Sequence, residues 1–476
     1  MTKAYNMLIK GKWLPGRERL EVKNPYNGEV LGTVPIASKK EVDAAIEGAQ
    51  KAFYTFSQVP AHQRAKILET TSNLINERKR EVAETLSKES GKPIKDAIGE
   101  VSRAVQTFKF AAEEAKQIHG HTILMDAAIG AEKRIAFYQR FPIGVIGAIT
   151  PFNFPLNLVA HKVAPAIAAG NTVVLKPAST TPLTSIKLGE IMMEAGLPEG
   201  ALNIVFGSGS TVGEWIVSDP RLAMVSLTGS PPVGHRIREL AGLKRVTLEL
   251  GSNSAVIVET DTDLEAAVPR CVTGAFAYAG QICISVQRIY VHQSIFNKFR
   301  DMFLERTKGL KIGDPMDEAT DLGTMITEGD AIRAESWVKE AIEQGAEILI
   351  GGTRRGNILE PTVLTKVKPE MKVSCIEIFA PVVSLDPYQD FEQALEMVNN
   401  SIYGLQAGVY TNDVNKAFKA FRRLHVGGVM INDIPTFRVD HMPYGGVKES
   451  GTGREGLKYA VEEMTEMKLV VFNLKE

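Results

Sequence analysis

The chain has 476 residues, too many for one ordinary hydrophobic core, and its 44% hydrophobic and 23% charged residues are typical of a globular protein. Its 55 basic and 56 acidic side chains leave a formal net charge of −1, which gives no electrostatic reason to expect nucleic acid or an anionic membrane as a partner. The three cysteines and eight histidines form neither a C-x-x-C pair nor an H-E-x-x-H pattern, so we expect no disulfide framework and no metal site.

The N-terminal region and the hydropathy along the chain predict where the protein resides. Residues 1–13 contain no apolar run long enough for a signal peptide. No uninterrupted apolar stretch reaches about 18 residues, the length that a membrane-spanning helix requires. We therefore expect a soluble, cytoplasmic protein with no membrane partner.

Helical patterning dominates the N-terminal part of the chain, after a short polar hairpin at 8–13. Apolar residues recur at spacings of three and four over 42–56, 64–89 and 95–117, which predicts three amphipathic helices. Short apolar runs then alternate with helical segments, as in βαβ units around a buried parallel sheet. The predicted strands lie at 141–149, 172–176, 202–206 and 224–227, and the helices between them at 158–169 and 183–195.

A second alternation follows a boundary near residues 249–252 and predicts a second α/β layer. Its strands are expected at 255–258, 288–292, 347–349, 382–385 and 407–410, with helices such as 293–307 and 390–399 between them. Neither half accommodates the segments 120–140 and 466–474. These segments are apolar enough to need a partner strand, so we expect extended arms at a subunit interface.

The chain is therefore predicted to have an α/β fold in three parts. The first part takes 1–119 and 141–250, the second takes 251–450, and the third, the extended arm, takes 120–140 and 451–476.

Two glycine-rich turns each lie between a predicted strand and a predicted helix. The first contains Gly209 and Gly213, but it is one residue too long for the dinucleotide pattern G-x-G-x-x-G, and by itself a plain strand-to-helix turn explains it better. The second, about twenty residues on, contains Gly229 and Ser230. A glycine backbone can approach a phosphate closely and a helix N-terminus favours its charge, so two such turns in one half favour dinucleotide binding.

Cys283 and Glu249 are candidates for chemistry, although neither is decisive alone. A single cysteine after a helical stretch is more often a small buried hydrophobic residue than a nucleophile. Glu249 ends an apolar strand, where a buried carboxylate is costly without a task or a partner. A structural ion pair would explain Glu249 equally well.

Taken together and in order, seven motifs resemble those of the aldehyde dehydrogenase superfamily over nearly the whole chain. They lie at 150–155, 174–177, 227–230, 248–252, 280–283, 377–381 and 443–455. The separation of Glu249 and Cys283, 34 residues (283 − 249), also agrees with the family. The chain resembles the branch of lactaldehyde, non-phosphorylating glyceraldehyde-3-phosphate, sulfolactaldehyde and phosphonoacetaldehyde dehydrogenases. The resemblance implies a Rossmann-type cofactor domain at 1–119 and 141–250 and an α/β catalytic domain at 251–450. It also implies that the β-strand oligomerisation arm, 120–140 and 451–476, assembles a homodimer or homotetramer.

The resemblance implies catalytic roles for five residues. Cys283 would attack the aldehyde carbon as a thiolate, and the Asn153 side chain with the Cys283 backbone N–H would donate to the resulting oxyanion. After hydride has passed to a nicotinamide, Glu249 would act as general base for hydrolysis of the thioester. Lys162 and Glu455 match family positions thought to relay the proton.

The resemblance also implies NAD or NADP as cofactor and a set of residues that bind it. The matching positions are Thr150, Pro151, Phe152, Lys176, Ser179, Gly209, Gly213, Gly229, Ser230, Leu250, Gly251, Glu377 and Phe379. Many NAD-preferring members carry glutamate where Ser179 stands; a glutamate would repel the 2′-phosphate of NADP, whereas serine would not. We expect NADP to be tolerated and dual use of both cofactors, the alternative being a neutral substitution without effect on the cofactor.

Three residues predict the class of aldehyde. His161 stands where many members carry tryptophan, Arg438 directly precedes the C-terminal motif, and Arg103 is placed like a residue lining the aldehyde tunnel. An arginine is more often a solvated surface charge, but its planar fork suits an anion. The combination resembles subfamilies that act on short hydroxylated or anionic aldehydes.

Three other functions compete with this prediction. A dehydrogenase that passes the thioester to coenzyme A typically lacks the general-base glutamate, so Glu249 disfavours it. A catalytically silent structural relative would not need Cys283, Glu249 and Asn153 together. A cysteine hydrolase without redox chemistry would leave the two glycine turns and Lys176 unexplained.

Overall fold

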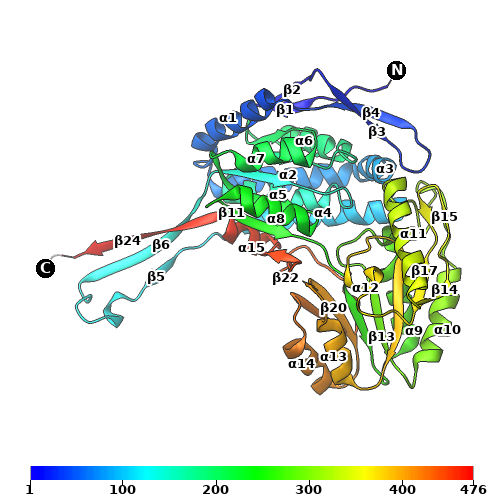
Figure 1. Cartoon of the computed structure of the whole chain (residues 1–476). Helices are drawn as coiled ribbons and strands as arrows, with labels where there is room; N and C mark the ends of the chain where they lie inside the picture. The colour runs from blue at the N-terminus through cyan, green and yellow to red at the C-terminus, as the bar shows by residue number, and fades with distance from the viewer. Residues whose placement is uncertain (1, 475–476) are drawn as a thin grey trace.

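A computed structural model describes residues 2–474 of the chain and contains three larger sheets (Figure 1). The eight-stranded sheet has the order β2-β1-β9-β8-β7-β10-β11-β23, and its strands β9, β8, β7, β10 and β11 run parallel. Their bounds are β1 Met7–Ile9, β2 Lys12–Leu14, β7 Val145–Ile149, β8 Thr172–Lys176, β9 Leu202–Ile204, β10 Leu222–Thr228, β11 Arg245–Glu249 and β23 Gly451–Thr452. β7, β8 and β9 are buried throughout, because apolar runs without alternation suit strands covered on both faces.

Helices cover both faces of this sheet. α1 and α8 contact the sheet, and α7 packs against both of them. α5 and α6 also contact the sheet, and α2, α3 and α4 pack on the outer side of these two helices. Their bounds are α1 Lys39–Phe56, α2 Ala61–Glu77, α3 Lys79–Ser90, α4 Ile94–Glu114, α5 Asn157–Ala169, α6 Leu183–Glu194, α7 Glu214–Ser218, α8 Pro231–Ala241 and α15 Leu457–Glu463, with a π-helical turn at Gly209–Gly213. No helix within residues 2–474 is long and apolar enough to cross a membrane.

Two predicted elements were wrong because each is divided in the structure. The helix expected over 64–89 is α2 followed by α3, because the chain leaves helical geometry at Arg78 (φ −100°, ψ 20°). α2 packs against α5, and α6 packs against both α2 and α3. The strand expected over 141–149 is also two elements. β6 ends at Pro142, and Gly144 adopts φ 130° before β7 begins.

The seven-stranded sheet has the order β14-β17-β18-β13-β12-β20-β21, all parallel except the edge strand β14. Its strands are β12 Ala255–Val258, β13 Arg288–His292, β14 Glu347–Ile350, β17 Thr362–Thr365, β18 Val382–Tyr388, β20 Gln406–Tyr410 and β21 Gly428–Ile431. Its helices are α9 Leu264–Phe276, α10 Phe296–Lys308, α11 Glu328–Glu343, α12 Lys372–Cys375, α13 Phe391–Asn399 and α14 Val414–Arg423. Short pairs complete the fold: β3 Arg19–Lys23 with β4 Val30–Pro35, β15 Arg354–Arg355 with β16 Ile358–Leu359, and β19 Tyr403–Gly404 with β22 Val447–Lys448.

The three-stranded sheet projects from the body as an arm (Figure 1). It contains β5 (His121–Ile123), β6 (Arg134–Pro142) and β24 (Thr465–Asn473), so both predicted extended segments are confirmed as strands. β24 pairs antiparallel with β6 along its whole length, and each segment therefore finds its partner strand within the same chain. Within the predicted arm segment 451–476, β23 and α15 lie against the first sheet and its helices instead. The domain boundaries remain a prediction, and residues 1, 475 and 476 lie outside the described residues.

Candidate active site

The candidate active site lies where segments adjoining the eight-stranded and the seven-stranded sheets meet. Glu249 ends β11, and Asn153 follows β7 within a few residues. Cys283 follows a 3-10 turn, Ala277–Gly280, in which Tyr278, Ala279 and Gly280 all adopt positive φ. A Cβ on Gly280 would collide with the Ala380 carbonyl, so only glycine permits this close approach just before Cys283.

Cys283 lines two cavities. Its Sγ lies 3.0 Å from the hydroxyl oxygen of Tyr444, and burial raises the pKa of the thiol to about 11. The Asn153 side chain donates through Nδ2 to the Gln281 carbonyl (3.0 Å). An amide NH₂ carries two hydrogens, so the second remains available to a developing oxyanion. Among the described residues, Asn153 Oδ1 has no partner.

Two buried carboxylates near Cys283 have opposite electrostatic environments. Neither oxygen of Glu249 has a hydrogen-bond partner within residues 2–474, and burial together with the charge of Glu455 raises its pKa well above the usual value. Glu455 accepts from Lys162 Nζ (3.0 Å) and Arg438 Nη2 (2.9 Å). Although burial opposes it, these two cations hold the pKa of Glu455 well below its usual range. The pair therefore separates into a proton acceptor and a permanent anion.

The first cavity, of about 260 Å³, lies at the carboxyl ends of β7, β10 and β11. The connections from β7 run outward to β8 and β9 and then return to β10, so the cavity opens where the strand order reverses, the usual ligand site of such sheets. It is lined by Pro151, Phe152, Asn153, Thr228, Gly229, Ser230, Leu250, Gly251, Cys283, Arg333, Glu377 and Phe379. Arg333 and Thr228 were not predicted. Thr228 lies within the motif at 227–230, whereas Arg333 lies in none of the seven motifs.

The remaining predicted cofactor residues form a neighbouring cluster. Lys176 donates through Nζ to the carbonyls of Pro177 (3.0 Å) and Gly207 (3.3 Å), and Ser179 Oγ donates to the same Gly207 carbonyl (3.0 Å). A Cβ on Gly213 would contact the Lys176 side chain. The turn that contains Gly209 and Gly213 therefore lies against this cluster, and the Thr150 amide donates to the Lys176 carbonyl (3.2 Å).

These residues fit a dinucleotide, because a buried cation, Lys176, and a half-buried carboxylate, Glu377, both lack a directly contacting opposite charge within residues 2–474. Burial lowers the pKa of Lys176 to about 8. Burial also raises the pKa of Glu377 to about 7, although its carboxylate accepts from the Ser252 amide (2.9 Å). Ribose hydroxyls and phosphates would satisfy both groups.

The second cavity, of about 70 Å³, also reaches Cys283 and is lined by Arg103, Phe154, Asn157, Leu158, Ile282, Cys283, Ile284, Thr436, Arg438 and Tyr444. An outer cavity of about 390 Å³ is lined by Ser102, Arg103, Gln106, Phe110, Arg438, Val439, Asp440 and His441. Arg103 and Arg438 line both the second cavity and the outer cavity, and they therefore lie between the surface and Cys283. This arrangement suits a tunnel for a small substrate.

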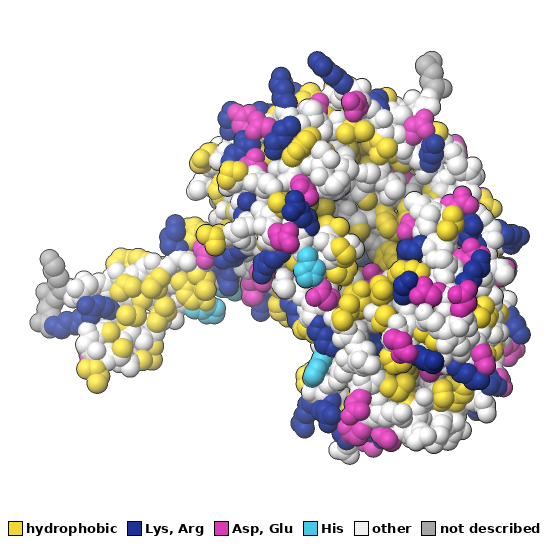
Figure 2. All heavy atoms as spheres, in the orientation of Figure 1, with side chains coloured by type: hydrophobic (Ala, Val, Ile, Leu, Met, Phe, Trp, Pro, Cys, Tyr) yellow, Lys and Arg dark blue, Asp and Glu magenta, His cyan; other side chains and the backbone are white. Residues whose placement is uncertain are grey.

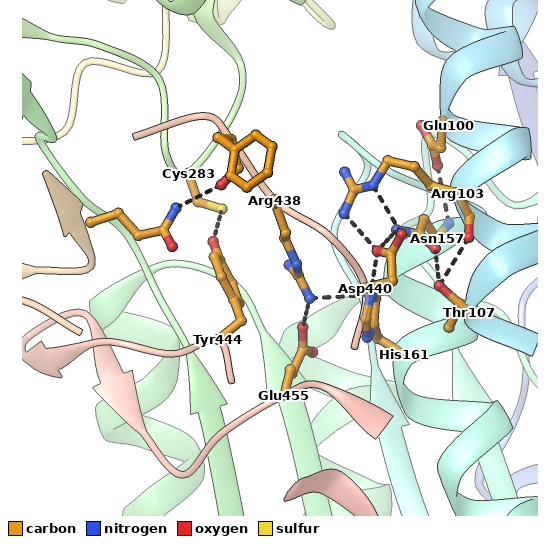
Figure 3. Close-up of polar contacts among 12 residues, drawn as sticks. Glu100, Arg103, Thr107, Asn157, His161, Cys283, Arg438, Asp440, Tyr444 and Glu455 are labelled. Carbon is orange, nitrogen blue, oxygen red and sulfur yellow. Dashed lines mark hydrogen bonds and ion pairs between the residues drawn. The ribbon is translucent and has the colours of Figure 1, made fainter. Parts of the chain in front are cut away.

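The three residues predicted to bind substrate meet in one polar network (Figure 3). Arg438, only 5% exposed, pairs with Glu455 and lies 3.1 Å from His161 Nε2, while its own Nε has no partner among the described residues. Arg103 is 30% exposed and pairs with Asp440 (2.7 Å). His161 is buried against Asp440 (2.9 Å) and lines neither cavity; burial lowers its pKa, which favours the neutral ring.

Asp440 and Tyr444 were not predicted as site residues. Asp440 accepts from Arg103 and from Asn157 Nδ2 (3.0 Å) and contacts His161. Although burial opposes it, His161 and Arg103 hold the pKa of this carboxyl well below its usual range. Tyr444 lies within the motif at 443–455, which could have indicated it, whereas the signal for Asp440 was its proximity to Arg438 along the chain.

Comparisons with known proteins agree with this geometry. The family model "Aldehyde dehydrogenase family" matches residues 13–470. The chain belongs to the aldehyde dehydrogenase family. One relative, the 3-sulfolactaldehyde dehydrogenase of Priestia aryabhattai, is 48% identical over 99% of this chain and 98% of its own length.

Two solved aldehyde dehydrogenase structures superimpose closely on this one. Aldehyde dehydrogenase 21 from Physcomitrella patens, in complex with the reaction product succinate, has a TM-score of 0.97 at 44% identity and covers 99% of both chains. The glyceraldehyde-3-phosphate dehydrogenase GapN from Methanocaldococcus jannaschii, complexed with NADP, has a TM-score of 0.93 at 42% identity and covers 96% of this chain and 100% of its own. The predicted aldehyde dehydrogenase fold and branch are thereby confirmed for this dehydrogenase.

Proposed function

We propose that this aldehyde dehydrogenase uses NAD or NADP to oxidise a short aldehyde bearing an anionic or hydroxyl group to its acid, through a thioester on Cys283. The observation that carries the proposal is the position of Cys283 between two different cavities. One cavity fits a dinucleotide, and the other is approached past two arginines. Sγ of Cys283 is the atom that ligands in the two cavities can both contact.

The chain's own residues can perform each step. Sγ of Cys283 attacks the aldehyde carbon, and the carbonyl electrons move to oxygen, where Asn153 and the Cys283 amide donate hydrogen bonds. A bound oxidised nicotinamide supplies the hydride acceptor for this carbon. Glu249 then takes a proton from water as the water attacks the thioester; the carbon–sulfur bond breaks and the acid is released. The unpaired oxygens and raised pKa of Glu249 suit a general base.

The proton taken by Glu249 must leave the buried site. Glu455 lies close enough to raise the pKa of Glu249, and Lys162 donates to Glu455. We propose Lys162 and Glu455 as a path for this proton, in which the negative charge of Glu455 first raises the affinity of Glu249 for it. Arg438 completes the neutralisation of Glu455.

NADP is proposed as an accepted cofactor alongside NAD. Ser179 offers a small hydroxyl beside Lys176, and neither side chain would repel a 2′-phosphate. The GapN relative, with its bound NADP, supports this proposal. The aldehyde's anionic character is supported by the relatives too, since the names sulfolactaldehyde and glyceraldehyde-3-phosphate and the bound succinate each denote an anion.

For substrate binding, we assign direct contact to Arg103 and to the free Nε–H of Arg438. Both line the tunnel, and a guanidinium N–H without a partner is costly to bury unless a ligand accepts from it. His161 would then act through Asp440, which orients Arg103, rather than by touching the aldehyde.

The rival functions are disfavoured by the same geometry. Glu249 has two free carboxylate oxygens next to the nucleophile, which transfer of the thioester to coenzyme A would not need. A silent relative would have no reason to keep an unpaired buried carboxylate. A simple cysteine hydrolase would leave the cavity at β7 and β10 without a ligand.

A rate comparison tests the proposal. Sulfolactaldehyde, lactaldehyde and propanal are each offered with NAD and with NADP, and reduction of the nicotinamide is followed by absorbance. We expect oxidation of all three, with the highest kcat/KM for the anionic aldehyde. Cys283→Ala should abolish turnover while cofactor binding persists, whereas Cys271→Ala and Cys375→Ala should retain most activity. A preference for long apolar aldehydes would overturn the substrate assignment, and an active Cys283→Ala enzyme would overturn the mechanism.

A further inference from the structure

Tyr444 contacts the nucleophile, yet none of the steps above uses it. Its side chain is 2% exposed and its hydroxyl oxygen lies 3.0 Å from Cys283 Sγ (Figure 3). Among the described residues, Sγ is the hydrogen-bond partner of this hydroxyl. A thiolate carries no proton, so once Cys283 ionises the phenol must be the donor in this contact.

The phenol is held and polarised from its other side. The Arg438 guanidinium lies over the Tyr444 ring, 3.7 Å from its centroid, and points away from Cys283 toward Glu455. Arg438 is fixed there by Glu455, which is itself paired with Lys162. A cation over an aromatic ring favours negative charge on the phenol oxygen, so it makes the O–H a stronger donor.

Tyr444 keeps its proton in this environment. Burial and the neighbouring Cys283 raise its pKa well above the usual value, and Arg438 opposes this shift without reversing it. The hydroxyl therefore acts as a hydrogen-bond donor and not as a base. The same contact with Tyr444, together with the charge of Arg438, favours ionisation of a thiol that burial otherwise keeps neutral.

We propose that Tyr444 is a further catalytic residue, whose hydroxyl donates to Cys283 Sγ whenever the sulfur carries negative charge. This proposal rests on the thioester mechanism above. The donation stabilises the thiolate before attack and loosens as the sulfur–carbon bond forms and the charge moves to the aldehyde oxygen. In the last step the carbon–sulfur bond breaks, its electron pair stays on sulfur, and the hydroxyl donates again. The phenol proton stays on Tyr444 throughout, and the water proton goes to Glu249.

Alkylation of Cys283 tests this directly, because the thiolate reacts and the thiol does not. The full-length enzyme is treated with iodoacetamide across a range of pH, and modification of the peptide that contains Cys283 is followed by mass spectrometry. A hydrogen bond to a charged group is worth enough that Tyr444→Phe should raise the midpoint by about one to two pH units. The matched control Tyr410→Phe, a buried tyrosine of β20, should leave it unchanged.

A second replacement guards against simple disruption of the fold. Substituting 3-fluorotyrosine at position 444 keeps the size of the ring but makes the phenol a stronger donor, so the midpoint should move to lower pH. Opposite shifts from the two replacements support the proposal, because a packing defect would not reverse its sign. If the fluorinated enzyme and Tyr444→Phe both keep the parent profile, Tyr444 is a packing residue only.

The same variants separate this proposal from the mechanism on which it rests. Alkylation requires no aldehyde and no turnover, so an active Cys283→Ala enzyme would overturn the mechanism without altering the alkylation result. In turnover, Tyr444→Phe should slow the burst of reduced nicotinamide, because less thiolate is present for attack, and also the steady state, because the leaving thiolate has lost its donor. A burst and a steady state as fast as those of the parent would contradict the assigned role.

Discussion

At the scale of single residues, the site separates groups of the same chemical type by their surroundings. Glu249 and Glu455 are both buried carboxylates, but only Glu455 has cations in contact, so one pKa is raised and the other lowered. Arg438 and Arg103 are likewise different. Arg438 is buried and neutralises Glu455, whereas Arg103 is partly exposed at the tunnel. Residue identity alone therefore does not assign a role.

The first prediction concerns Glu249→Gln. If the glutamate serves hydrolysis of the thioester, the variant should show a single burst of reduced nicotinamide and a steady state slower by about 10²–10⁴-fold. In the parent, protonation of Glu249 removes the base as the pH falls. Because the Glu249 pKa is raised, kcat should begin to fall at a pH above the ordinary glutamate pKa of about 4.3. Rapid mixing measures both. A variant with no burst would move Glu249 to an earlier step.

The second prediction concerns Ser179→Glu. The new carboxylate would accept hydrogen bonds from ribose hydroxyls and repel a 2′-phosphate. The ratio of kcat/KM for NAD to that for NADP should rise, with Ser208→Glu, on an exposed turn nearby, as the matched control. Steady-state kinetics with both cofactors decide it. A parent enzyme that already used NADP hundreds of times less efficiently than NAD would refute the role of Ser179.

The third prediction uses Arg103→Ala, because removing Arg438 would leave Glu455 short of a partner and confuse binding with damage. Loss of one charge-assisted hydrogen bond should lower kcat/KM for an anionic aldehyde about ten- to a hundredfold. Propanal should be barely affected, and the exposed Arg80→Ala should change neither substrate. Equal losses on both aldehydes would make Arg103 a structural residue.

At the scale of elements, one buried ion pair fixes the segment between β7 and α5. α5 has no side-chain cap of its own, and Glu100 on α4 accepts from the amides of Leu156 (2.9 Å) and Asn157 (3.1 Å). The same carboxylate pairs with Lys92, whose ammonium lies over the Phe154 ring. A carboxylate at a helix N-terminus matches the helix dipole, so this contact holds the loop that carries Asn153.

The fourth prediction follows from this pair. Glu100→Gln leaves Lys92 buried without an anion, which should cost about 3–5 kcal/mol in the free energy of unfolding. The control Glu81→Gln breaks the ion pair of Glu81 with Lys187. Because the Glu81 side chain is 61% exposed, this loss should cost less than about 1 kcal/mol. Urea denaturation followed by circular dichroism compares the two. Similar losses for both variants would show that the buried pair does not anchor this segment.

At the scale of the whole molecule, the arm is the part least explained by a single chain. β24 is an edge strand, and apolar side chains gather along the arm in Figure 2. The exposed ones include Ile123, Ile135, Met467, Leu469, Val471 and Phe472. A long apolar edge of this kind is normally covered, so we propose that a second copy of the chain covers it in a dimer or tetramer.

The fifth prediction tests this association. Leu469→Lys combined with Val471→Lys places two charges on one face of β24 and should dissociate the assembly. Light scattering after size-exclusion chromatography measures the mass, with Tyr54→Lys, an exposed position of α1, as the control. A parent that elutes as a monomer, or a double variant of unchanged mass, would contradict the proposed role of the arm.

The sequence by itself determined the family and the alternation of strands and helices, and it suffices to propose Cys283 as the nucleophile. These inferences depend on local patterns, since a strand, its glycine turn and the motif around Cys283 each span only a few residues. The extended segments of the arm were also visible in the sequence, because each is apolar without helical periodicity.

Only the tertiary structure decided which distant residues meet. Tyr444 is 161 positions from Cys283 along the chain, and Asp440 is 337 from Arg103; no local pattern relates such pairs. Periodicity shows that a helical face is buried but not against what, so it missed the break at Arg78 between α2 and α3, which both pack against α4 and α6. Charge and burial at the site arise from these long-range contacts, and they alone distinguish Glu249, the proposed base, from the fixed anion Glu455.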